Sequence, residues 1–198
     1  MARPSVSGQP IAPYPRRIEV RELSTPRARL RSLRPDDDQA LLEVYGDVEA
    51  VRYLGRPPAT LEELQQRLAR MAEEMERGEG AYWTLTDPGA DRALGFLGYF
   101  RWDPPHRTAE LGYMLHRSRW GKGLMGEVLP PVVRYGFQEL GLHRMEARVD
   151  PENTASIRLV HRLGFREEGR LRERTLLPDG SWTDLAIFGL LAHELPPG

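Results

Sequence analysis

The chain contains no cysteine. That absence excludes disulfide bonds, thiolate metal sites and a cysteine nucleophile, and it is consistent with a cytoplasmic protein. No apolar run in the sequence reaches the length that spans a membrane, and the first residues lack the apolar core of a signal peptide. We therefore expect a cytoplasmic location and no membrane partner.

Charge of one sign is not in excess, because the formal net charge is −1 with 29% charged residues. This balance creates no global field for nucleic acid or acidic lipid, so we expect neither as a partner. Histidine, aspartate and glutamate nowhere show the spacing of a metal site, and we expect no metal. Lysine is nearly missing as well, since Lys122 is the only one.

A length of 198 residues suits one domain with short tails. Scattered prolines among polar residues predict an N-terminal tail over residues 1–26, mobile in part. Strand and helix patterns then continue without an internal linker, which predicts a single domain over residues 27–192. Residues 193–198 are expected to form a C-terminal tail.

Two helices are predicted from their start signals. Pro35 and the acidic residues 36–38 are typical of a first helical turn, where proline fits and carboxylates suit the helix dipole. Thr60 and Glu63 form a capping box, which predicts a helix that runs to about Arg77.

Alternation of apolar and polar residues, with turn residues between the runs, predicts seven strands. They span residues 27–34, 81–86, 93–102, 108–115, 144–149, 168–177 and 182–191. Helical patterns cover residues 124–140 and 156–163. The sum is an α+β domain with a mixed, mostly antiparallel sheet.

A glycine-rich turn joins the strand over 108–115 to the helix over 124–140. Its residues are Trp120, Gly121, Lys122, Gly123, Leu124 and Met125. Backbone N–H groups at such a turn are unpaired, and the helix dipole adds partial positive charge, so the place suits a phosphate. Pro130 and Pro131 lie inside the helix and predict a kink, or an end near Leu129 with a restart at Pro131.

A second element follows about thirty residues later, where Asn153 and Ser156 lead into the helix over 156–163. Judged from local sequence, Asn153 is a turn or cap residue and Ser156 is a residue of the helix N-terminus.

In order and spacing, these elements resemble the GNAT superfamily of acyl-CoA-dependent N-acyltransferases, and more narrowly its RimJ/RimL branch of ribosomal-protein alanine N-acetyltransferases. The resemblance covers roughly residues 28–191. It is carried by four segments: 33–35, 110–113, 120–125 and 153–156 with Gly164-Phe165. It implies the GNAT fold, in which a seven-stranded, mostly antiparallel sheet is flanked by helices and two strands splay apart to receive the cofactor.

The resemblance implies acetyl-CoA as the co-substrate. The pyrophosphate would lie on the backbone of the glycine turn, from Trp120 to Met125, while the pantetheine arm would pair with Met114 and Leu115 and hydrogen-bond Asn153. The family loop reads Arg/Gln-x-x-Gly-x-Gly/Ala. Trp120 and Met125 depart from it in a way familiar from the Rim-type branch.

The resemblance also implies the catalytic residues. Many members carry a tyrosine four residues after the Ser156 position, where Val160 stands here, so Ser156 is the candidate that assists the leaving thiolate. Glu110 matches a family glutamate that serves as general base in some members, although a structural role stays open for it. Glu173 is the alternative base, and the family's hairpin glutamate would fall at Thr175.

The expected function is acetyl transfer from acetyl-CoA to a primary amine, by direct attack in a ternary complex. The acceptor stays open between a protein N-terminal amine and a small amine such as an aminoglycoside or polyamine. A non-catalytic acyl-CoA-binding module is an alternative, because Val160 cannot donate a proton. A nucleotide-binding domain is rejected, since Lys122 is followed by Gly123 rather than by a hydroxyl residue. Homodimers are frequent in this superfamily, and a monomer and a homodimer both stay open.

Overall fold

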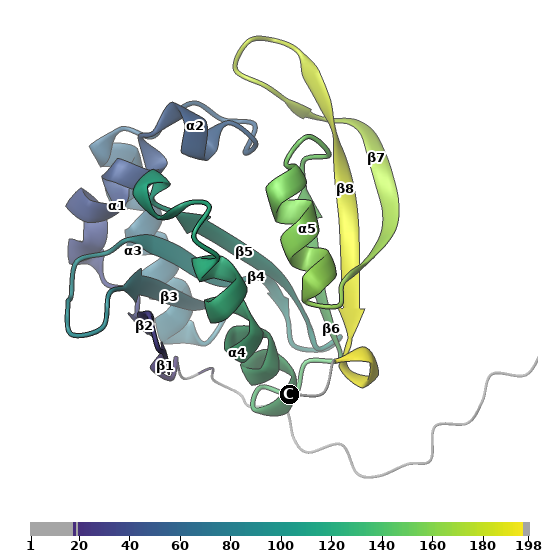
Figure 1. Cartoon of the computed structure of the whole chain (residues 1–198), viewed down its shortest axis with the longest axis horizontal. Helices are drawn as coiled ribbons and strands as arrows, with labels where there is room; N and C mark the ends of the chain where they lie inside the picture. The colour runs from purple at the N-terminus through teal and green to yellow at the C-terminus, as the bar shows by residue number, and fades with distance from the viewer. Residues whose placement is uncertain (1–17, 19, 196–198) are drawn as a thin grey trace, which may run out of the picture.

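The computed structural model describes residue 18 and residues 20–195 of the chain. Its centre is an eight-stranded sheet in the order β1-β2-β3-β4-β5-β6-β8-β7 (Figure 1). Only β5 and β6 pair in parallel; the other neighbours are antiparallel. The strands are β1 (Leu23–Thr25), β2 (Ala28–Ser32), β3 (Ala81–Thr86), β4 (Gly95–Asp103), β5 (Thr108–Leu115), β6 (Arg144–Val149), β7 (Arg166–Leu176) and β8 (Trp182–Leu191).

The expected strand count of seven is wrong by one, because β1 precedes the first predicted strand. At three residues, β1 is too short to show an alternating pattern. Its turn to β2 is closed by the Ala28 N–H, which donates to Thr25 Oγ1 at 3.1 Å. The remainder of the predicted N-terminal tail falls largely on residues 1–17 and 19, which lie outside the described residues.

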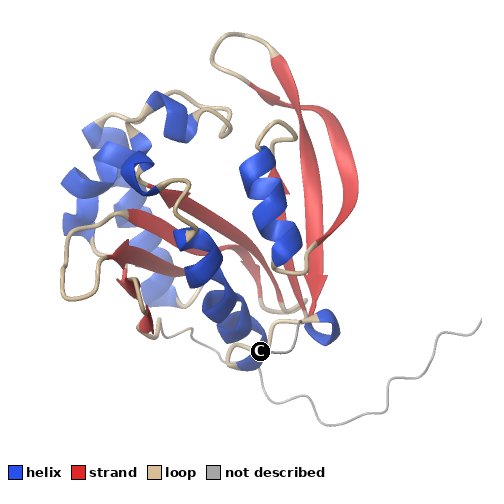
Figure 2. Cartoon of the chain, viewed as in Figure 1, coloured by secondary structure: helices blue, strands red, loops and turns tan. Residues whose placement is uncertain are grey.

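Helices flank the sheet (Figure 2). They are α1 (Asp38–Tyr45), α2 (Val48–Val51), α3 (Leu61–Arg77), α4 (Leu124–Gln138) and α5 (Thr154–Arg162), with short 3-10 helices η1 (Pro35–Asp37), η2 (Arg117–Arg119) and η3 (Ala192–Glu194). Thus residues 193 and 194 of the predicted C-terminal tail belong to a 3-10 helix, and 196–198 lie outside the described part. Along residues 18 and 20–195, no helix combines the length and apolar character needed to cross a membrane.

The capping box that predicts α3 is present. Thr60 Oγ1 accepts from the Glu63 N–H at 3.2 Å, and Glu63 Oε2 accepts from the Thr60 N–H at 2.8 Å. Gly78 ends the helix in the left-handed conformation, at φ 73°.

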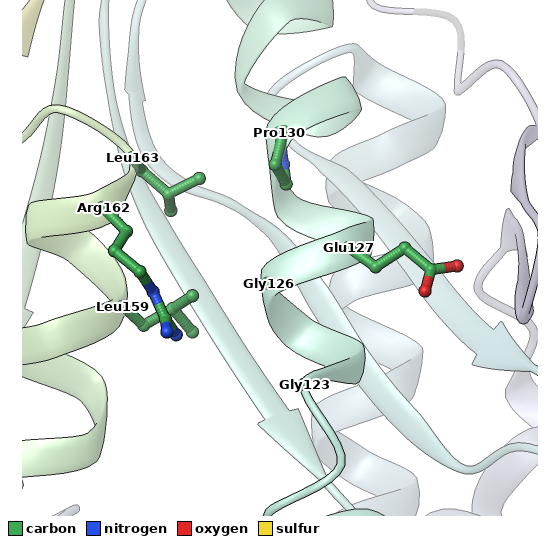
Figure 3. A pocket seen from close by; sticks show the side chains of 7 residues that line it. All are labelled: Gly123, Gly126, Glu127, Pro130, Leu159, Arg162 and Leu163. Atoms are coloured by element: carbon green, nitrogen blue, oxygen red, sulfur yellow. The ribbon is translucent and has the colours of Figure 1, made fainter.

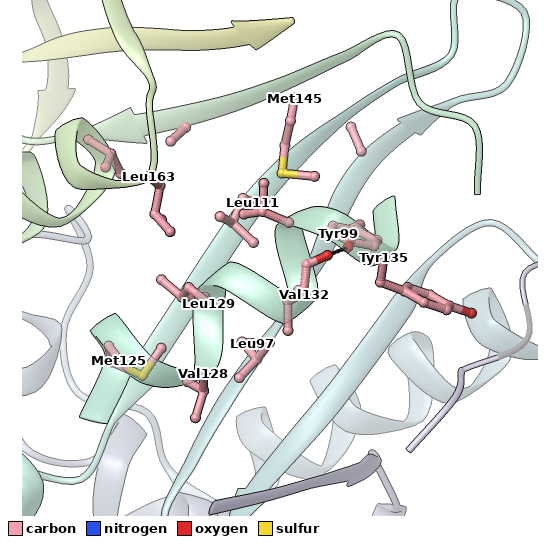
Figure 4. Packing of buried hydrophobic residues seen from close by; sticks show 14 of the residues in the cluster. Leu97, Tyr99, Leu111, Met125, Val128, Leu129, Val132, Tyr135, Met145 and Leu163 are labelled. Atoms are coloured by element: carbon pink, nitrogen blue, oxygen red, sulfur yellow. Dashed lines mark hydrogen bonds between the residues drawn. The ribbon is translucent and has the colours of Figure 1, made fainter. Parts of the chain in front are cut away.

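Helix α4 runs unbroken through Pro130 and Pro131, so the expected end near Leu129 does not occur. Each proline removes one backbone donor, a cost of about 3 kcal/mol in a helix interior. Burial offsets this cost, because the apolar side of α4 packs on the sheet through Val128, Val132 and their neighbours (Figure 4). The Tyr99 hydroxyl from β4 also donates to the Val132 carbonyl.

The sheet carries a different apolar cluster on each face. The larger one lies beneath α4 and α5 and includes Leu111 and Leu115 of β5. The second lies beneath α1 and α3 and is built around Tyr45 and Phe96, with Met114 packed against it. Alternation along β5 therefore directs consecutive side chains to opposite faces.

Candidate functional site

Strands β5 and β6 splay apart after a short paired segment. They pair only from Thr108 to Glu110 on β5 and from Arg144 to Glu146 on β6. Beyond this point β5 pairs only with β4, and β6 only with β8. The expected splayed strand pair is therefore confirmed, and it leaves one backbone edge of β5 without a strand partner (Figure 1).

The antiparallel ladder determines which backbone groups of β5 face this gap. The His116 N–H donates to the Leu94 carbonyl at 2.8 Å, on the β4 side. Because hydrogen-bonding direction alternates along such a strand, the backbone of Met114 also points to β4, and those of Tyr113 and Leu115 point into the gap. Of the two residues expected to contact the cofactor, Met114 thus faces β4 and Leu115 faces the gap, together with Tyr113.

The glycine turn leads directly into the N-terminus of α4. Gly121 and Gly123 both adopt the left-handed conformation, at φ 71° each, and α4 has no side-chain N-cap. The free N–H groups of the first helical turn, with the helix dipole, form an anion-binding arrangement. Trp120 has a further role, because its indole Nε1 donates to the Leu115 carbonyl at 2.7 Å.

Arg27 holds this loop from the turn between β1 and β2. Its NH1 group donates to the Lys122 carbonyl at 2.8 Å, and its Nε lies 2.5 Å from Glu127 Oε2. Lys122 itself turns back, and its Nζ donates to the Ser118 carbonyl at 2.9 Å. The loop is therefore fixed by contacts to its backbone, which leave the N–H groups at the helix start available.

A pocket of about 410 Å³ opens between α4 and α5, next to the glycine turn (Figure 3). It is lined by Gly123, Gly126, Glu127, Pro130, Leu159, Arg162 and Leu163. The volume is in the range of small-ligand sites. Gly123 and Gly126 add no side chain to the pocket next to the glycine turn, and Arg162 on α5 supplies positive charge.

Asn153 and Ser156 lie together at the start of α5. Asn153 is the N-cap, and its Oδ1 accepts from the Ser156 N–H at 3.0 Å. Ser156 Oγ lies 2.6 Å from the Tyr113 hydroxyl, so a hydrogen bond connects α5 to β5 across the splay. Burial raises the pKa of Tyr113, which therefore stays protonated at neutral pH.

Tyr113 is the site residue that the sequence reasoning misses. Val160, which stands where many family members carry a tyrosine, is buried in the core. A tyrosine hydroxyl reaches Ser156 from β5 instead. Tyr113 is three residues after Glu110 and therefore projects from the opposite face of β5.

Glu110 lies at the apex of the splay, on the sheet face opposite α4 and α5. Its Oε2 is 2.9 Å from Arg101 Nε and 3.0 Å from Arg148 Nε, but neither pair has hydrogen-bond alignment. Burial raises the pKa of Glu110, and the two arginines oppose that shift. A β-bulge around Arg101, which has φ 48°, brings this guanidinium to the carboxylate.

The alternative base, Glu173, lies on the exposed strand β7. It adopts φ 47°, and its N–H donates to Asp184 Oδ1 at 2.8 Å. Across the part of the chain that the structure describes, no three or more histidine, aspartate and glutamate side chains gather as metal ligands would.

Comparison with known proteins agrees with this geometry. The family description "Acetyltransferase (GNAT) domain" matches residues 27–166. The chain is 33% identical over 173 residues to the uncharacterized N-acetyltransferase p20 of Bacillus licheniformis, covering 87% of this chain and 97% of that protein. It is 32% identical over 135 residues to the [ribosomal protein uS5]-alanine N-acetyltransferase of Escherichia coli, covering 68% of this chain and 69% of the relative.

Among solved structures, the fold is similar to that of RimL, the ribosomal L7/L12 α-N-protein acetyltransferase, in complex with coenzyme A. The TM-score is 0.78 at 19% identity, and the match covers 86% of this chain and 98% of that one. With the matched domain, the relatives and the splayed sheet taken together, the chain belongs to the GNAT family of N-acetyltransferases, in its RimJ/RimL-like branch.

Proposed function

We propose that this chain transfers an acetyl group from acetyl-CoA to a primary amine by direct attack in a ternary complex. The observation that carries the proposal is the pair of chemically different faces at the splay. Glu110 lies on one face of β5, and the hydrogen-bonded hydroxyls of Tyr113 and Ser156 lie on the other. A thioester in the gap would have a proton acceptor on one side and a proton donor on the other.

The residues present fit coenzyme A. Backbone N–H groups from Gly121 to Met125 would hold the pyrophosphate at the start of α4. The gap-facing backbone of Tyr113 would pair with an amide group of the pantetheine arm, whereas the Leu115 carbonyl is already held by Trp120 Nε1. Asn153 would add a side-chain contact through its amide nitrogen, since its oxygen caps α5. Acetyl-CoA supplies the activated acetyl thioester when bound.

Each protein group then has a defined task. Glu110, in its ionised form, accepts the proton that the amine loses as the new C–N bond forms, directly or through a water molecule. The Leu115 N–H lies on the gap side of β5, where it would polarise the thioester carbonyl. As the C–S bond breaks, the Tyr113 phenol gives its proton to the departing thiolate, and the Ser156 hydroxyl donates a hydrogen bond to it.

For the acceptor, we propose a protein N-terminal amine as the first candidate, because the Escherichia coli relative is named for that reaction. Small amines such as aminoglycosides and polyamines are the second class, and a binding module without turnover is the third possibility.

A thiol-release assay separates these outcomes. The chain is incubated with acetyl-CoA and, in turn, peptides with free N-termini, aminoglycosides and polyamines, and product is identified by mass. Release that depends on peptide supports the proposal. Tight coenzyme A binding with no release for any acceptor would make the chain a binding module.

A further inference from the structure

Two arginines converge on one buried tyrosine beneath the first helices. Tyr45 is the last residue of α1 and is almost fully buried. Arg56, between α2 and α3, and Arg67, on α3, each place the guanidinium carbon 5.3 Å from the centroid of the Tyr45 ring. Both are cation–π contacts on a desolvated ring, and they bring two positive charges to one place.

Neither charge is neutralised by the protein. Among the described residues, no aspartate or glutamate oxygen lies within the 4.0 Å ion-pair distance of Arg56 or Arg67. Arg67 Nε is buried and has no hydrogen-bond partner. Burial, and then the charge of Arg67, lower the pKa of Arg56. By contrast, the buried Arg31 is paired with two carboxylates, those of Asp37 and Asp91.

An unpaired donor at a half-buried guanidinium is unusual, because the polar groups that proteins bury are normally hydrogen-bonded. The carboxylate of Glu74 lies in the same region, but it accepts a hydrogen bond from the Tyr82 hydroxyl at 2.5 Å and forms no ion pair with Arg67. The Tyr45 hydroxyl is the polar group that the chain places beside both arginines, and it is neutral. The positive charge of the pair therefore stays available for an anionic ligand.

The arginine pair is connected to the face of β5 that carries Glu110. The Tyr45 ring lies 6.3 Å from Phe96, which pairs with Met114 on β5. Phe100, 5.8 Å from Phe96 between ring centroids, pairs with Glu110. This row of aromatic rings lies on the face away from α4 and the pocket at the glycine turn.

The segment that carries Arg56 also contacts the last hairpin. A Cβ atom on Gly55 would lie 2.1 Å from Thr175 Cγ2 on β7. Gly55 has φ 62°, so this close approach depends on a residue without a side chain. Arg56 thus lies next to the place where the α2–α3 segment meets β7.

We propose that Arg56 and Arg67 bind a carboxylate of the acceptor, so that the acceptor class is a primary amine that carries a carboxylate. This inference depends on the proposed acetyl transfer. Planar guanidinium groups match a carboxylate through paired N–H donors. The same two charges repel polycations, which disfavours polyamines and aminoglycosides as acceptors. The carboxylate could come from a small amino acid or from an acidic side chain near a peptide N-terminus.

Matched acceptors test the proposal. The peptide pair differs only in aspartate or asparagine at the second position, the small-molecule pair is β-alanine and its amide, and spermidine is the polycation. We expect kcat/KM to be higher by about tenfold or more for the carboxylate member of at least one pair, since one charge-assisted hydrogen bond supplies that factor. The pair that shows the preference identifies the source of the carboxylate.

Variants then locate the preference. Arg56→Gln and Arg67→Gln should each raise KM for the carboxylate acceptor and leave KM for the amide acceptor and for acetyl-CoA unchanged. Arg70→Gln, an exposed position on the same helix, is the matched control and should keep the preference. Equal kcat/KM for carboxylate and amide in both pairs, or a preference retained in both arginine variants, would overturn the inference.

Two further measurements keep the test decisive. If Arg67→Gln does not fold, Arg56→Gln and competitive inhibition of the intact chain by propionate, the carboxylate without the amine, still report on the site. If no amine is acetylated, the proposed function fails separately from this inference. Calorimetric binding of the aspartate peptide to the intact chain, lost in Arg56→Gln, would then still support the carboxylate site, and its absence would reject it.

Discussion

The hydroxyl oxygens of Tyr113 and Ser156 lie 2.6 Å apart and connect β5 to α5 across the open end of the splay. One hydroxyl comes from a strand and the other from a helix that starts more than forty residues later in the chain, at Thr154. The bond therefore depends on the whole domain being folded. It also places a protonated phenol beside a serine where the proposed leaving thiolate would form.

Tyr113→Phe removes the phenol and keeps the ring. We expect kcat to fall by about 10²-fold, the lower range for loss of a general acid, while KM for acetyl-CoA changes little. Steady-state thiol release checks this result. Ser156→Ala is the companion variant, and the double variant should be little worse than the poorer single one, because the two hydroxyls act as a unit. An unchanged kcat in Tyr113→Phe would remove the phenol from the mechanism.

The pH profile depends on Glu110. Burial raises the pKa of this carboxyl, and a general base works only when it is ionised. Activity should therefore fall as the pH drops through that raised pKa, so the acid limb of kcat/KM lies above the ordinary range of a glutamate.

Glu110→Gln should lower kcat at neutral pH by about 10²-fold or more and remove this acid limb, with coenzyme A binding retained. A thermal melt serves as the control, because the substitution also removes the charge that faces Arg101 and Arg148. A folded variant with the parental pH profile would transfer the role of base to Glu173 or to water.

The glycine turn can be tested with a matched pair of glycines. Gly123→Ala places a side chain at φ 71°, which costs about 1–2 kcal/mol and displaces the N–H groups at the start of α4. We expect the Kd of coenzyme A to rise by about tenfold or more. Gly141→Ala is the control, since Gly141 has φ 66° with open space around its Cβ position and lies at the other end of α4. It should lose similar stability and keep the Kd.

Stability depends on a buried ion pair. Asp37 Oδ1 lies 2.5 Å from Arg31 NH2, and the same carboxylate accepts from the Thr84 hydroxyl at 2.7 Å. Asp37→Ala leaves Arg31 buried with only part of its charge compensated, so we expect a loss of about 3 kcal/mol in the free energy of unfolding. Urea titration measures this loss. Asp36→Ala, one residue earlier and exposed, should change the free energy of unfolding by less than about 0.5 kcal/mol.

Where a local pattern was complete, the sequence predicted the fold well. The strands β3, β5 and β6 begin and end at the predicted residues, since alternation and turn residues bound each of them. Helix α3 follows from its capping box. Short elements such as β1 and α2 carry too few residues for a pattern, and α4 tolerates two prolines because tertiary burial outweighs local preference.

The candidate site was predictable only in its local parts. The glycine turn and Asn153 are visible because adjacent residues define them. Tyr113 could not be recognised from the sequence, because its partner Ser156 lies on α5, far along the chain. The arginine pair could not be recognised either, because it forms only when the segments that carry Arg56 and Arg67 fold onto Tyr45 of α1. In a chain whose positive charge is almost all arginine, the two that meet at one buried tyrosine ring can be recognised only once the fold is known.

Arg27 couples two distant parts of the chain, since it binds the Lys122 carbonyl and the Glu127 carboxylate from the β1–β2 turn. An anion that tightens the loop would also restrain this hairpin at the far edge of the sheet from β7. Amide hydrogen exchange at Ala28 would then slow when ligand arrives, so the first hairpin becomes a spectroscopic reporter of occupancy. A version of the chain shortened past Arg27 would lose both this reporter and the contacts of Arg27 that hold the glycine turn.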